Sequence, residues 1–248
     1  MNENYRHRQL LNVLEERKVL STTEIIELLD ISPATARRDI SKLNEQGLLR
    51  KVRNGAEAIV REISAHKKES VNNIDEKQRI AEAASKLCRD GDSVVLTCGS
   101  TMLMLGSHLC GRHLQIMTNY LPLANHLIEH NHDDLVIMGG QYNKNKAITL
   151  SLSPQNETGY AANIMFTSGK GFTEEGLYKT DMIIAHSENQ MSSKAEKYVV
   201  LLDSTKLGKR VGMLFSELNK IDILITGSEA DPDIIQQLRA KGLEVILA

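Results

Sequence analysis

The amino-acid sequence predicts an α/β protein in two parts, a small, mainly helical N-terminal module and a larger domain built on a parallel sheet. Helix-capping signals and a tight-turn signal follow one another closely over residues 1–58. From residue 75 to residue 248, short apolar runs alternate with segments of helical periodicity. Residues 59–74 are mixed in charge and weakly periodic, which is typical of a linker. We therefore expect two domains, residues 1–58 and 75–248, joined by this linker.

Three helices are predicted in order over the N-terminal module. Leucines at helical spacing indicate the first helix over residues 5–16, and a break follows before the second helix. Ser21 with a glutamate three residues later forms a capping box, which predicts that the second helix starts here. Ser32 is a favourable N-cap and Pro33 suits the first helical position, so a third helix is expected to run from there to about Gln46.

The third helix has one apolar face and one face suited to nucleic acid. Ala36, Ile40 and Leu43 fall together on a helical wheel and are expected to pack on the first two helices. On the other side, small residues near the helix start allow close approach to base edges, and arginine can bond guanine bidentately or hold phosphate. The residues expected to contact DNA from this segment are Ser32, Ala34, Thr35, Arg37, Arg38 and Lys42.

A basic hairpin is predicted directly after the third helix, with its turn at Asn54-Gly55. Its cations Arg50, Lys51 and Arg53 would lie along the DNA backbone. Helices followed by a basic hairpin in this order predict a winged helix-turn-helix, and therefore a repressor that binds double-stranded operator DNA. The alternative, an ordinary helical subdomain with solvated cations, is disfavoured because cap, turn, helix and hairpin agree in order and spacing.

Charge and composition limit the other classes of protein. The formal net charge is −2, which argues against a uniformly basic surface for nucleic acid. Residues 1–68 carry 13 Lys and Arg against 10 Asp and Glu, so a mild excess of positive charge lies in the N-terminal part. No apolar run approaches the ~20 residues of a membrane helix, and the N-terminus lacks a signal-peptide pattern. A cytoplasmic protein without membrane contact is expected.

Strands and helices are predicted to alternate in the larger domain, which is the pattern of a parallel α/β sheet. The strands are expected at residues 93–98, 114–118, 134–138, 163–167, 197–202, 222–226 and 243–247. The helices are expected at residues 76–89, 101–110, 122–131, 180–194 and 232–241. Sheets of this kind bind ligands at the carboxyl ends of their strands, so the loops that follow the strands form the candidate ligand site.

Small and polar residues follow five of these strands, which indicates a site for a phosphorylated polyol. Residues 98–101 stand at a helix start, where exposed backbone N–H groups suit phosphate. Lys206 offers a cation for phosphate, and Asp203 and Asn119 can hydrogen bond to sugar hydroxyls. The residues expected to bind this effector are Cys98, Gly99, Ser100, Thr101, Asn119, Gly140, Lys170, Asp203 and Lys206.

Catalysis, metal binding and cofactors are not expected. His126 and His130 share a helix face, but the H-E-x-x-H pattern is absent and a solvated helix end is favoured. The three cysteines form no C-x-x-C pair, which disfavours a disulfide framework or a zinc site. A sugar-phosphate isomerase or deaminase with an accessory domain is the alternative. It would need a carboxylate base, for which Asp181 and Glu174 are the nearby candidates, and neither lies in a recognisable isomerase signature.

Several motifs of the N-terminal module resemble the helix-turn-helix of the DeoR family of transcriptional regulators. They are residues 31–40 (ISPATARRDI), Gly47-Leu48 and residues 54–56 (NGA). The family usually has glycine where Asn54 stands, and because asparagine tolerates positive φ the turn is expected to survive.

The larger domain is similar to the DeoR sensor domain over residues 75–248, through residues 98–101, Thr118-Asn119 and residues 203–206. That resemblance implies a fold related to ribose-5-phosphate isomerase, glucosamine-6-phosphate deaminase and CoA transferases. Cys98 and Lys170 depart from the usual family pattern, which suggests that they tune the choice of ligand.

Within the family, longer runs are similar to regulators that repress L-ascorbate utilisation operons. These runs are ISPATARRDI, KVRNGAEAI, TNYLPLAN, MGGQYNK, MFTSGKG, GLYKTDM and ITG. The resemblance implies that L-ascorbate 6-phosphate is the effector and that it relieves repression. Two-fold symmetric operators further imply a homo-oligomer, a dimer or a tetramer.

Overall fold

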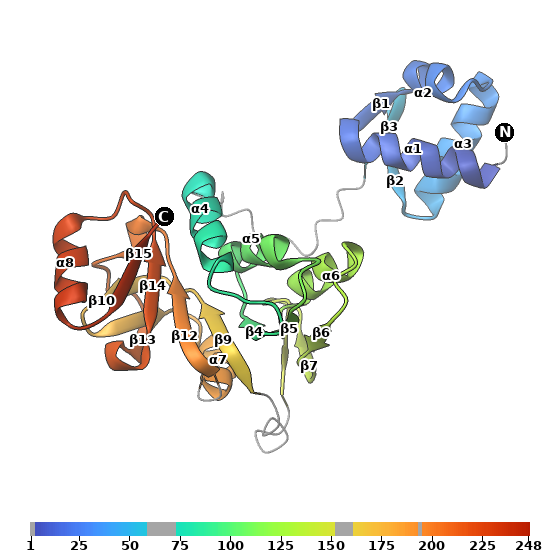
Figure 1. Ribbon diagram of the computed structural model, residues 1–248. Coiled ribbons are helices and arrows are strands. Elements are labelled where there is room, and N and C mark those ends of the chain that lie inside the picture. Colours follow the sequence, from blue (N-terminus) through green and yellow to red (C-terminus); the bar gives the residue numbers. More distant parts are fainter. Residues whose placement is uncertain (1–2, 59–72, 152–160, 193–194) are drawn as a thin grey trace. The chain divides into compact units, whose positions relative to one another are not determined.

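The computed structural model describes residues 3–58, 73–151, 161–192 and 195–248 (Figure 1). The chain divides into two compact units, residues 1–65 and residues 66–248. Most of the expected linker lies outside the described residues, so the domain limits 1–58 and 75–248 stay predictions. The two units are considered separately below.

The N-terminal unit consists of three helices and a three-stranded antiparallel sheet in the strand order β1-β3-β2. Its elements are α1 (Glu3–Arg17), β1 (Val19–Ser21), α2 (Thr22–Leu29), α3 (Pro33–Glu45), β2 (Leu49–Val52) and β3 (Gly55–Ala58). The three predicted helices are confirmed, but the stretch interpreted as a break between the first two is the strand β1. It is only three residues long and exists through its pairing with β3, which no local periodicity reveals.

The predicted caps of α2 and α3 are both present. Ser21 Oγ accepts a hydrogen bond from Glu24 N at 3.2 Å, and the Glu24 carboxylate accepts one from Ser21 N at 2.8 Å. Ser32 Oγ accepts a hydrogen bond from Thr35 N at 3.2 Å, with Pro33 at the first helical position. These bonds satisfy backbone donors that a helix start leaves unpaired, so the two starts are fixed locally.

The hairpin turn lies one residue earlier than the sequence predicts. Val52 pairs with Gly55, so the turn residues are Arg53 and Asn54, and Asn54 has a φ of 65°. Gly55 is a strand residue instead. A Cβ at Gly55 would lie 2.2 Å from Leu20 O, so glycine is required there for the close approach of β1 and β3.

The core of the N-terminal unit is formed by one apolar cluster. As predicted, the buried face of α3 contributes Ala36, Ile40 and Leu43. The remaining buried members come from α1, α2 and the sheet: Leu10, Leu14, Leu20, Ile25, Leu29, Leu49 and Ala56. The opposite face of α3 is therefore left at the surface.

The C-terminal unit is built on a seven-stranded parallel sheet in the order β15-β14-β12-β9-β4-β5-β6. Its strands are β4 (Ser93–Leu96), β5 (Gln115–Thr118), β6 (Leu135–Ile137), β9 (Ala162–Thr167), β12 (Ala195–Leu201), β14 (Ile223–Thr226) and β15 (Glu244–Leu247). All seven predicted strands belong to this sheet, with ends that differ by at most two residues. Their nearly continuous burial explains the apolar runs that predicted them.

Helices and shorter strands complete the unit. The helices are α4 (Ile74–Ser85), α5 (Ser100–Leu109), α6 (Leu121–Glu129), α7 (Met182–Ser192) and α8 (Pro232–Ala240). The shorter strands are β7 (Gln141–Asn143), β8 (Ile148–Leu150), β10 (Gly171–Thr173), β11 (Gly176–Lys179) and β13 (Met213–Glu217). The sequence analysis did not anticipate these shorter strands. β7 with β8 and β10 with β11 form local antiparallel hairpins of only three or four residues a strand, too short for a clear periodicity, and β13 pairs with β11 from a distant part of the chain.

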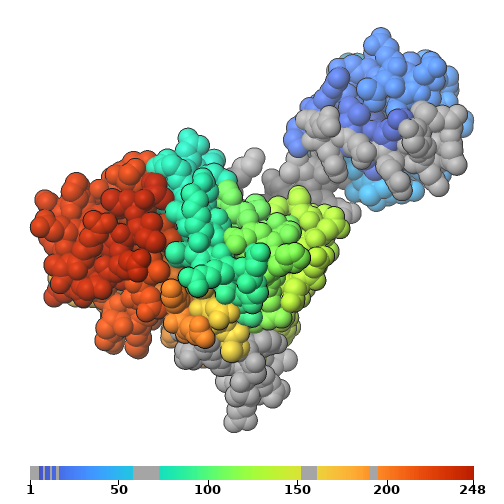
Figure 2. All heavy atoms as spheres, in the orientation of Figure 1, coloured from blue at the N-terminus to red at the C-terminus, as the bar shows by residue number. Residues whose placement is uncertain are grey.

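Two apolar cores lie on the two faces of the seven-stranded sheet. One includes Ile80 of α4, Leu105 of α5 and Leu123 of α6, and Figures 1 and 2 show α4 and α5 side by side over this face. The other core includes Phe172 of β10 and Leu238 of α8. No helix in the described part of the chain is both long and apolar enough to cross a membrane.

The topology of the sheet places a crevice at its centre. From β4 the chain adds β5 and β6 on one side, and then returns to add β9 and later strands on the other side. The strand order therefore reverses between β4 and β9. In open α/β sheets, ligands bind at the carboxyl ends of the strands at such a reversal.

Candidate functional site

The exposed face of α3 carries the residues predicted to contact DNA. Ala34, Arg37, Arg38 and Lys42 are exposed, as expected for a helix that enters a groove. Ser32 is also exposed, but its hydroxyl is used as the helix cap, and the Thr35 hydroxyl lies 2.9 Å from it. The helix thus presents small and cationic residues outward while its start is held rigid.

The wing is tied to α3 by polar contacts that the sequence analysis missed. Lys51 N donates a hydrogen bond to Asn44 Oδ1 at 2.8 Å, and Lys51 Nζ donates one to Ser41 Oγ at 3.1 Å. Arg50 forms an ion pair with Glu57 on the neighbouring strand. The predicted wing cations Arg50, Lys51 and Arg53 are all exposed. Asn44 therefore fixes the wing relative to the exposed face of α3.

Asp39 is a buried carboxylate in the middle of α3. It accepts hydrogen bonds from Arg6 Nε at 2.9 Å and Arg6 Nη2 at 3.3 Å, and His7 Nε2 lies 3.2 Å away. Burial alone raises the pKa of Asp39, but the hydrogen bonds from Arg6 and His7 outweigh it and the pKa is lowered. This cluster fixes the rotation of α3 against α1, and so the direction in which the exposed arginines point.

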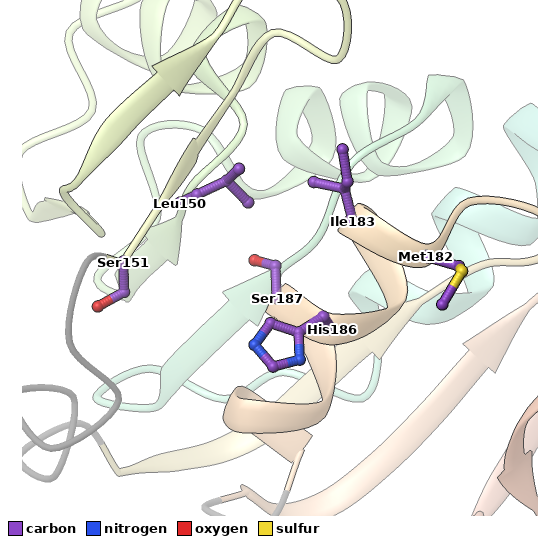
Figure 3. A pocket seen from close by; sticks show the side chains of 6 residues that line it. All are labelled: Leu150, Ser151, Met182, Ile183, His186 and Ser187. Carbon is purple, nitrogen blue, oxygen red and sulfur yellow. The ribbon is translucent and has the colours of Figure 1, made fainter.

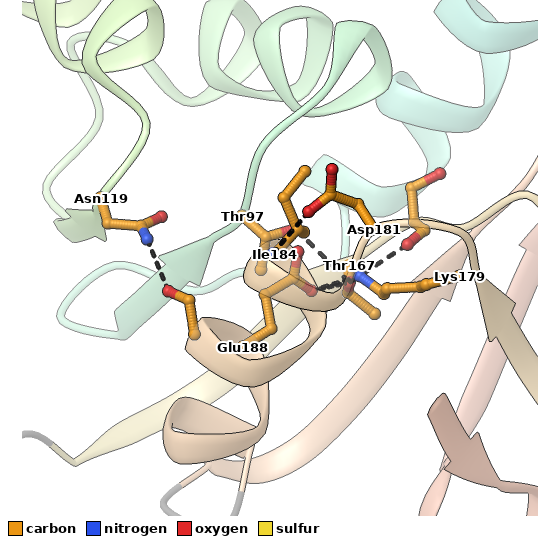
Figure 4. A network of polar contacts seen from close by, with 9 residues as sticks. Thr97, Asn119, Thr167, Lys179, Asp181, Ile184 and Glu188 are labelled. Carbon is orange, nitrogen blue, oxygen red and sulfur yellow. Dashed lines mark hydrogen bonds and ion pairs between the residues drawn. The ribbon is translucent and has the colours of Figure 1, made fainter. Parts of the chain in front are cut away.

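In the C-terminal unit, a buried polar network lies where β4 and β9 end (Figure 4). Thr97 Oγ1 lies 3.4 Å from Thr167 Oγ1, which also accepts a hydrogen bond from Lys179 Nζ at 2.9 Å. Lys179 forms an ion pair with Glu188 of α7, and both side chains are almost fully buried. The Lys179 ammonium also lies 4.5 Å from the centroid of the Phe215 ring. The crevice thus has a charged floor that the sequence analysis missed.

One oxygen of this floor is not hydrogen bonded. Within the part of the chain that the structure describes, Glu188 Oε1 is buried and lacks a hydrogen-bond partner. A buried carboxylate oxygen without a donor is costly, so the site has unused capacity to accept a hydrogen bond.

Asn119 connects this region to α7. Its amide donates a hydrogen bond to Ser187 Oγ at 2.8 Å (Figure 4) and another to Thr149 O at 3.0 Å. Ser187 also lines a cavity of about 350 Å³, together with Leu150, Ser151, Met182, Ile183 and His186 (Figure 3). This lining includes none of the nine predicted effector residues, although Ser187 bonds directly to one of them.

The loop after β12 gathers charged groups around Asp203. Asp203 is buried, and its carboxylate oxygens lie 3.3 Å from Lys206 Nζ and 3.7 Å from Lys77 Nζ. Asn73 Nδ2 donates a hydrogen bond to Asp203 Oδ1 at 3.2 Å, and the Thr205 hydroxyl donates another. Burial raises the pKa of Asp203, but the hydrogen bond from Thr205 and the nearby ammonium groups outweigh it and lower the pKa.

Lys206 lies close to charged groups of both signs. Burial lowers its pKa, Asp203 acts in the opposite direction, and Lys77 and Lys170 lower the pKa further by repulsion. We refer to Lys77, Lys170 and Lys206 as the basic cluster. It contains two of the predicted effector residues and one, Lys77, that the sequence analysis missed because it lies on α4, far away in the chain.

The other predicted effector residues lie at strand ends with different surroundings. Gly99 is the N-cap of α5 with a φ of 127°, and nothing lies within 4 Å of the position of an added Cβ. Cys98 is close to the floor, and burial raises the pKa of its thiol to about 12. Gly140 has a structural reason to be glycine, because a Cβ there would lie 1.9 Å from Leu150 O. Ser100 and Thr101 form the first turn of α5.

The two carboxylates considered as catalytic bases have different surroundings. Asp181 forms an ion pair with Lys146 and accepts hydrogen bonds from two backbone N–H groups of α7. Burial raises the pKa of Asp181, but these partners outweigh it and lower the pKa. Glu174 is exposed. The searched part of the chain holds no group of three His, Cys, Asp or Glu residues that could bind a metal ion.

A winged helix-turn-helix with an exposed cationic face, joined in one chain to an α/β unit with a charged crevice, defines a ligand-responsive DNA-binding regulator. The family model of the DeoR-like helix-turn-helix domain matches residues 6–74, and that of the DeoR C terminal sensor domain matches residues 72–228. The chain belongs to the DeoR family and is a DNA-binding transcriptional repressor with a sensor domain.

Relatives within this family are similar over nearly the whole chain. The chain is 53% identical over 252 residues to the HTH-type transcriptional regulator UlaR of Shigella sonnei (strain Ss046), covering 99% of both chains. It is equally similar to the UlaR regulator of Escherichia coli (strain K12 / DH10B).

Two solved structures share part of the fold. Ribose 5-phosphate isomerase A from Methanocaldococcus jannaschii is 21% identical, with a TM-score of 0.41 over 55% of this chain and 56% of that chain. RipA from Yersinia pestis is 12% identical, with a TM-score of 0.46 over 68% of this chain and 52% of that chain. At this level of similarity neither is informative about function.

Proposed function

We propose that this repressor controls an L-ascorbate utilisation operon in the cytoplasm and that L-ascorbate 6-phosphate, bound in the C-terminal unit, releases it from DNA. The 53% identity to UlaR regulators supports this, together with the resemblance to repressors of L-ascorbate utilisation. The observation that carries the proposal is the basic cluster around buried Asp203 at the carboxyl end of β12. A cationic site beside sugar-binding polar groups fits a phosphorylated, hydroxyl-rich ligand.

The proposed ligand position uses three kinds of group. We place the phosphate at the basic cluster, and the backbone N–H groups at the start of α5, where Gly99 leaves room for close approach, offer further donors to the ligand. The hydroxyls of the ligand bond to Asp203 and Asn119. Glu188 Oε1 can accept one more hydrogen bond, which adds a residue to the set predicted from the sequence.

A release titration tests this proposal. The protein selects an operator duplex from a random DNA pool, and fluorescence anisotropy then follows release of the labelled duplex. L-Ascorbate 6-phosphate is expected to release the duplex, whereas L-ascorbate, inorganic phosphate and ribose 5-phosphate at equal concentration are not. Release by ribose 5-phosphate alone would show that the ligand class is right and the named effector wrong.

DNA binding by this family member is proposed to require at least a dimer. The two α3 helices of a symmetric pair would then enter successive major grooves of a two-fold operator. Analytical ultracentrifugation of the protein with its selected duplex is expected to give two or four chains per duplex, and one chain per duplex would refute this point.

The alternative function, a sugar-phosphate isomerase or deaminase, would use the same crevice. Lys179 and Glu188 bring an ammonium and a carboxylate to a predicted sugar-phosphate site, which is the observation that favours isomerase chemistry. We propose that they instead bind ligand without turnover, since Glu188 is held in an ion pair and the relatives are named as regulators. An isomerisation assay with ribose 5-phosphate and L-ascorbate 6-phosphate is expected to show no activity above that of Glu188→Gln.

A further inference from the structure

The first turn of α4 is bonded directly to the loop of Asp203. Asn73, Glu76 and Lys77 lie on one face of this turn, at the i, i+3 and i+4 spacing that brings helical side chains together. Asn73 and Lys77 contact the Asp203 carboxylate, and Glu76 Oε1 accepts a hydrogen bond from Ser204 N at 2.6 Å. Residues more than 120 positions apart in the chain are thus joined by three polar contacts.

Asn73 itself is held in an uncommon conformation. It is the N-cap of α4, but its φ of 61° and ψ of 46° are left-handed, whereas N-caps ordinarily have extended backbone. Its side chain makes no capping hydrogen bond to the helix and reaches Asp203 instead. Backbone strain of this kind persists only when surrounding contacts maintain it. The Asn73–Asp203 bond therefore competes with the ordinary capped start of α4.

The Asn73–Asp203 contact lies at the start of α4, on the side of the C-terminal unit that follows the DNA-binding unit in the sequence. The DNA-binding unit precedes Asn73 in the sequence, and Asn73 is the first residue of the C-terminal unit that the structure describes, so Asp203 holds the start of α4 on the side from which the chain arrives. A phosphate at the basic cluster would bring negative charge next to Asp203 and would attract Lys77 and Lys206 away from it. The same carboxylate therefore serves both the predicted effector site and the start of α4.

We propose that Asn73 and Lys77 relay effector binding from the Asp203 loop to the DNA-binding unit. This inference rests on the proposed function and names its regulation. In the effector-free protein, Asp203 holds Asn73 left-handed, and that arrangement belongs to the DNA-competent state. Effector binding displaces Asp203 from Asn73 and Lys77, Asn73 takes the ordinary cap conformation, and the direction of the entering chain changes.

Two variants test whether loss of the Asn73–Asp203 bond is sufficient, whether or not the left-handed backbone remains favourable. Asn73→Ala removes the side chain and disfavours the left-handed backbone, whereas Asn73→Gly removes the side chain and permits it. Asn131→Ala is the matched control, because Asn131 is also exposed and left-handed, at a φ of 57°, and follows α6 instead of contacting Asp203. Equal thermal unfolding midpoints would establish that all three variants are folded.

Because operator binding and effector binding are thermodynamically linked, a change that favours the effector-bound state should weaken one affinity and strengthen the other. Both Asn73 variants should bind the operator duplex about tenfold more weakly without effector, and bind L-ascorbate 6-phosphate more tightly by a similar factor. A merely structural defect would weaken both affinities, so the opposite signs identify a relay. Asn131→Ala should change neither affinity.

The possible outcomes distinguish failure of the proposed relay from failure of the proposed effector. Unchanged operator affinity in both Asn73 variants overturns the relay, whatever the effector is. If the unaltered protein ignores L-ascorbate 6-phosphate and responds to ribose 5-phosphate instead, the named effector fails. The relay then stands only if the Asn73 variants bind operator more weakly and ribose 5-phosphate more tightly. If the unaltered protein responds and the variants respond identically, the relay alone is wrong.

Discussion

Glu188 of α7 forms a buried ion pair with Lys179 at the end of β11, directly beside the hydroxyl of Thr167 where β9 ends. The pair joins three elements below the central crevice of the sheet. Because both charges are removed from water, each depends on the other for compensation.

Glu188→Gln is therefore expected to destabilise the C-terminal unit by about 3–5 kcal/mol, since it leaves the Lys179 charge buried without its counter-ion. Urea unfolding followed by circular dichroism measures the change. The exposed pair of Glu82 and Lys86 gives a control, and Glu82→Gln should leave the midpoint nearly unchanged. A similar small effect for Glu188→Gln would show that the ion pair does not stabilise the fold.

Asp39 predicts an acid dependence of the N-terminal unit. Its pKa is lowered from 3.8 in the folded state, so the stabilisation is present above that value and is lost as pH falls through the folded pKa. Asp39→Asn should destabilise the unit near pH 7 and flatten the dependence of its stability on pH below about 4. The measurement is the free energy of unfolding of the N-terminal unit as a function of pH, in the unaltered protein and in Asp39→Asn. Parallel pH profiles of the two proteins would refute the role of Asp39.

Arg38 and Lys51 are expected to affect operator binding in different ways. Arg38→Ala should cost about 1–3 kcal/mol on the selected operator and relax the preference at one base position. Lys51→Ala should weaken binding to all duplexes alike and reduce the slope of log affinity against log salt by about one. Anisotropy titrations over a range of salt concentrations separate the two effects. Indifference of operator binding to both changes would contradict the DNA-binding surface.

Cys98 is expected to be unreactive despite its position in the crevice. Burial raises the pKa of its thiol to about 12, so almost none is thiolate near neutral pH. At pH 8, iodoacetamide should modify Cys110 before Cys98, as judged by mass spectrometry of peptides. Rapid labelling of Cys98 would mean that the crevice is more open than the structure shows.

Sequence patterns predicted those features that depend on local chemistry. The buried strands appear as apolar runs because both faces of the sheet are covered, and the caps at Ser21 and Ser32 require only neighbouring residues. Asp203 and Lys206 lie close together because both follow one strand, and their role in binding an effector stays a prediction.

Features that depend on distant partners could not be found in this way. β1 is a strand only because β3 pairs with it. Lys179, Glu188 and Asp39 are charged residues, which sequence patterns place at the surface, and only the tertiary contacts reveal that they are buried in pairs. Lys77 joins the basic cluster through a contact across more than 120 residues, for which one sequence gives no signal.

Calorimetric titration of L-ascorbate 6-phosphate into the unaltered protein and Lys206→Ala tests the central claim most directly, with Lys220→Ala as an exposed lysine control. Binding is expected in the unaltered protein and in Lys220→Ala. Lys206→Ala should lose it while still binding the operator duplex normally. Full binding and normal release from DNA in Lys206→Ala would contradict the placement of the effector at the basic cluster.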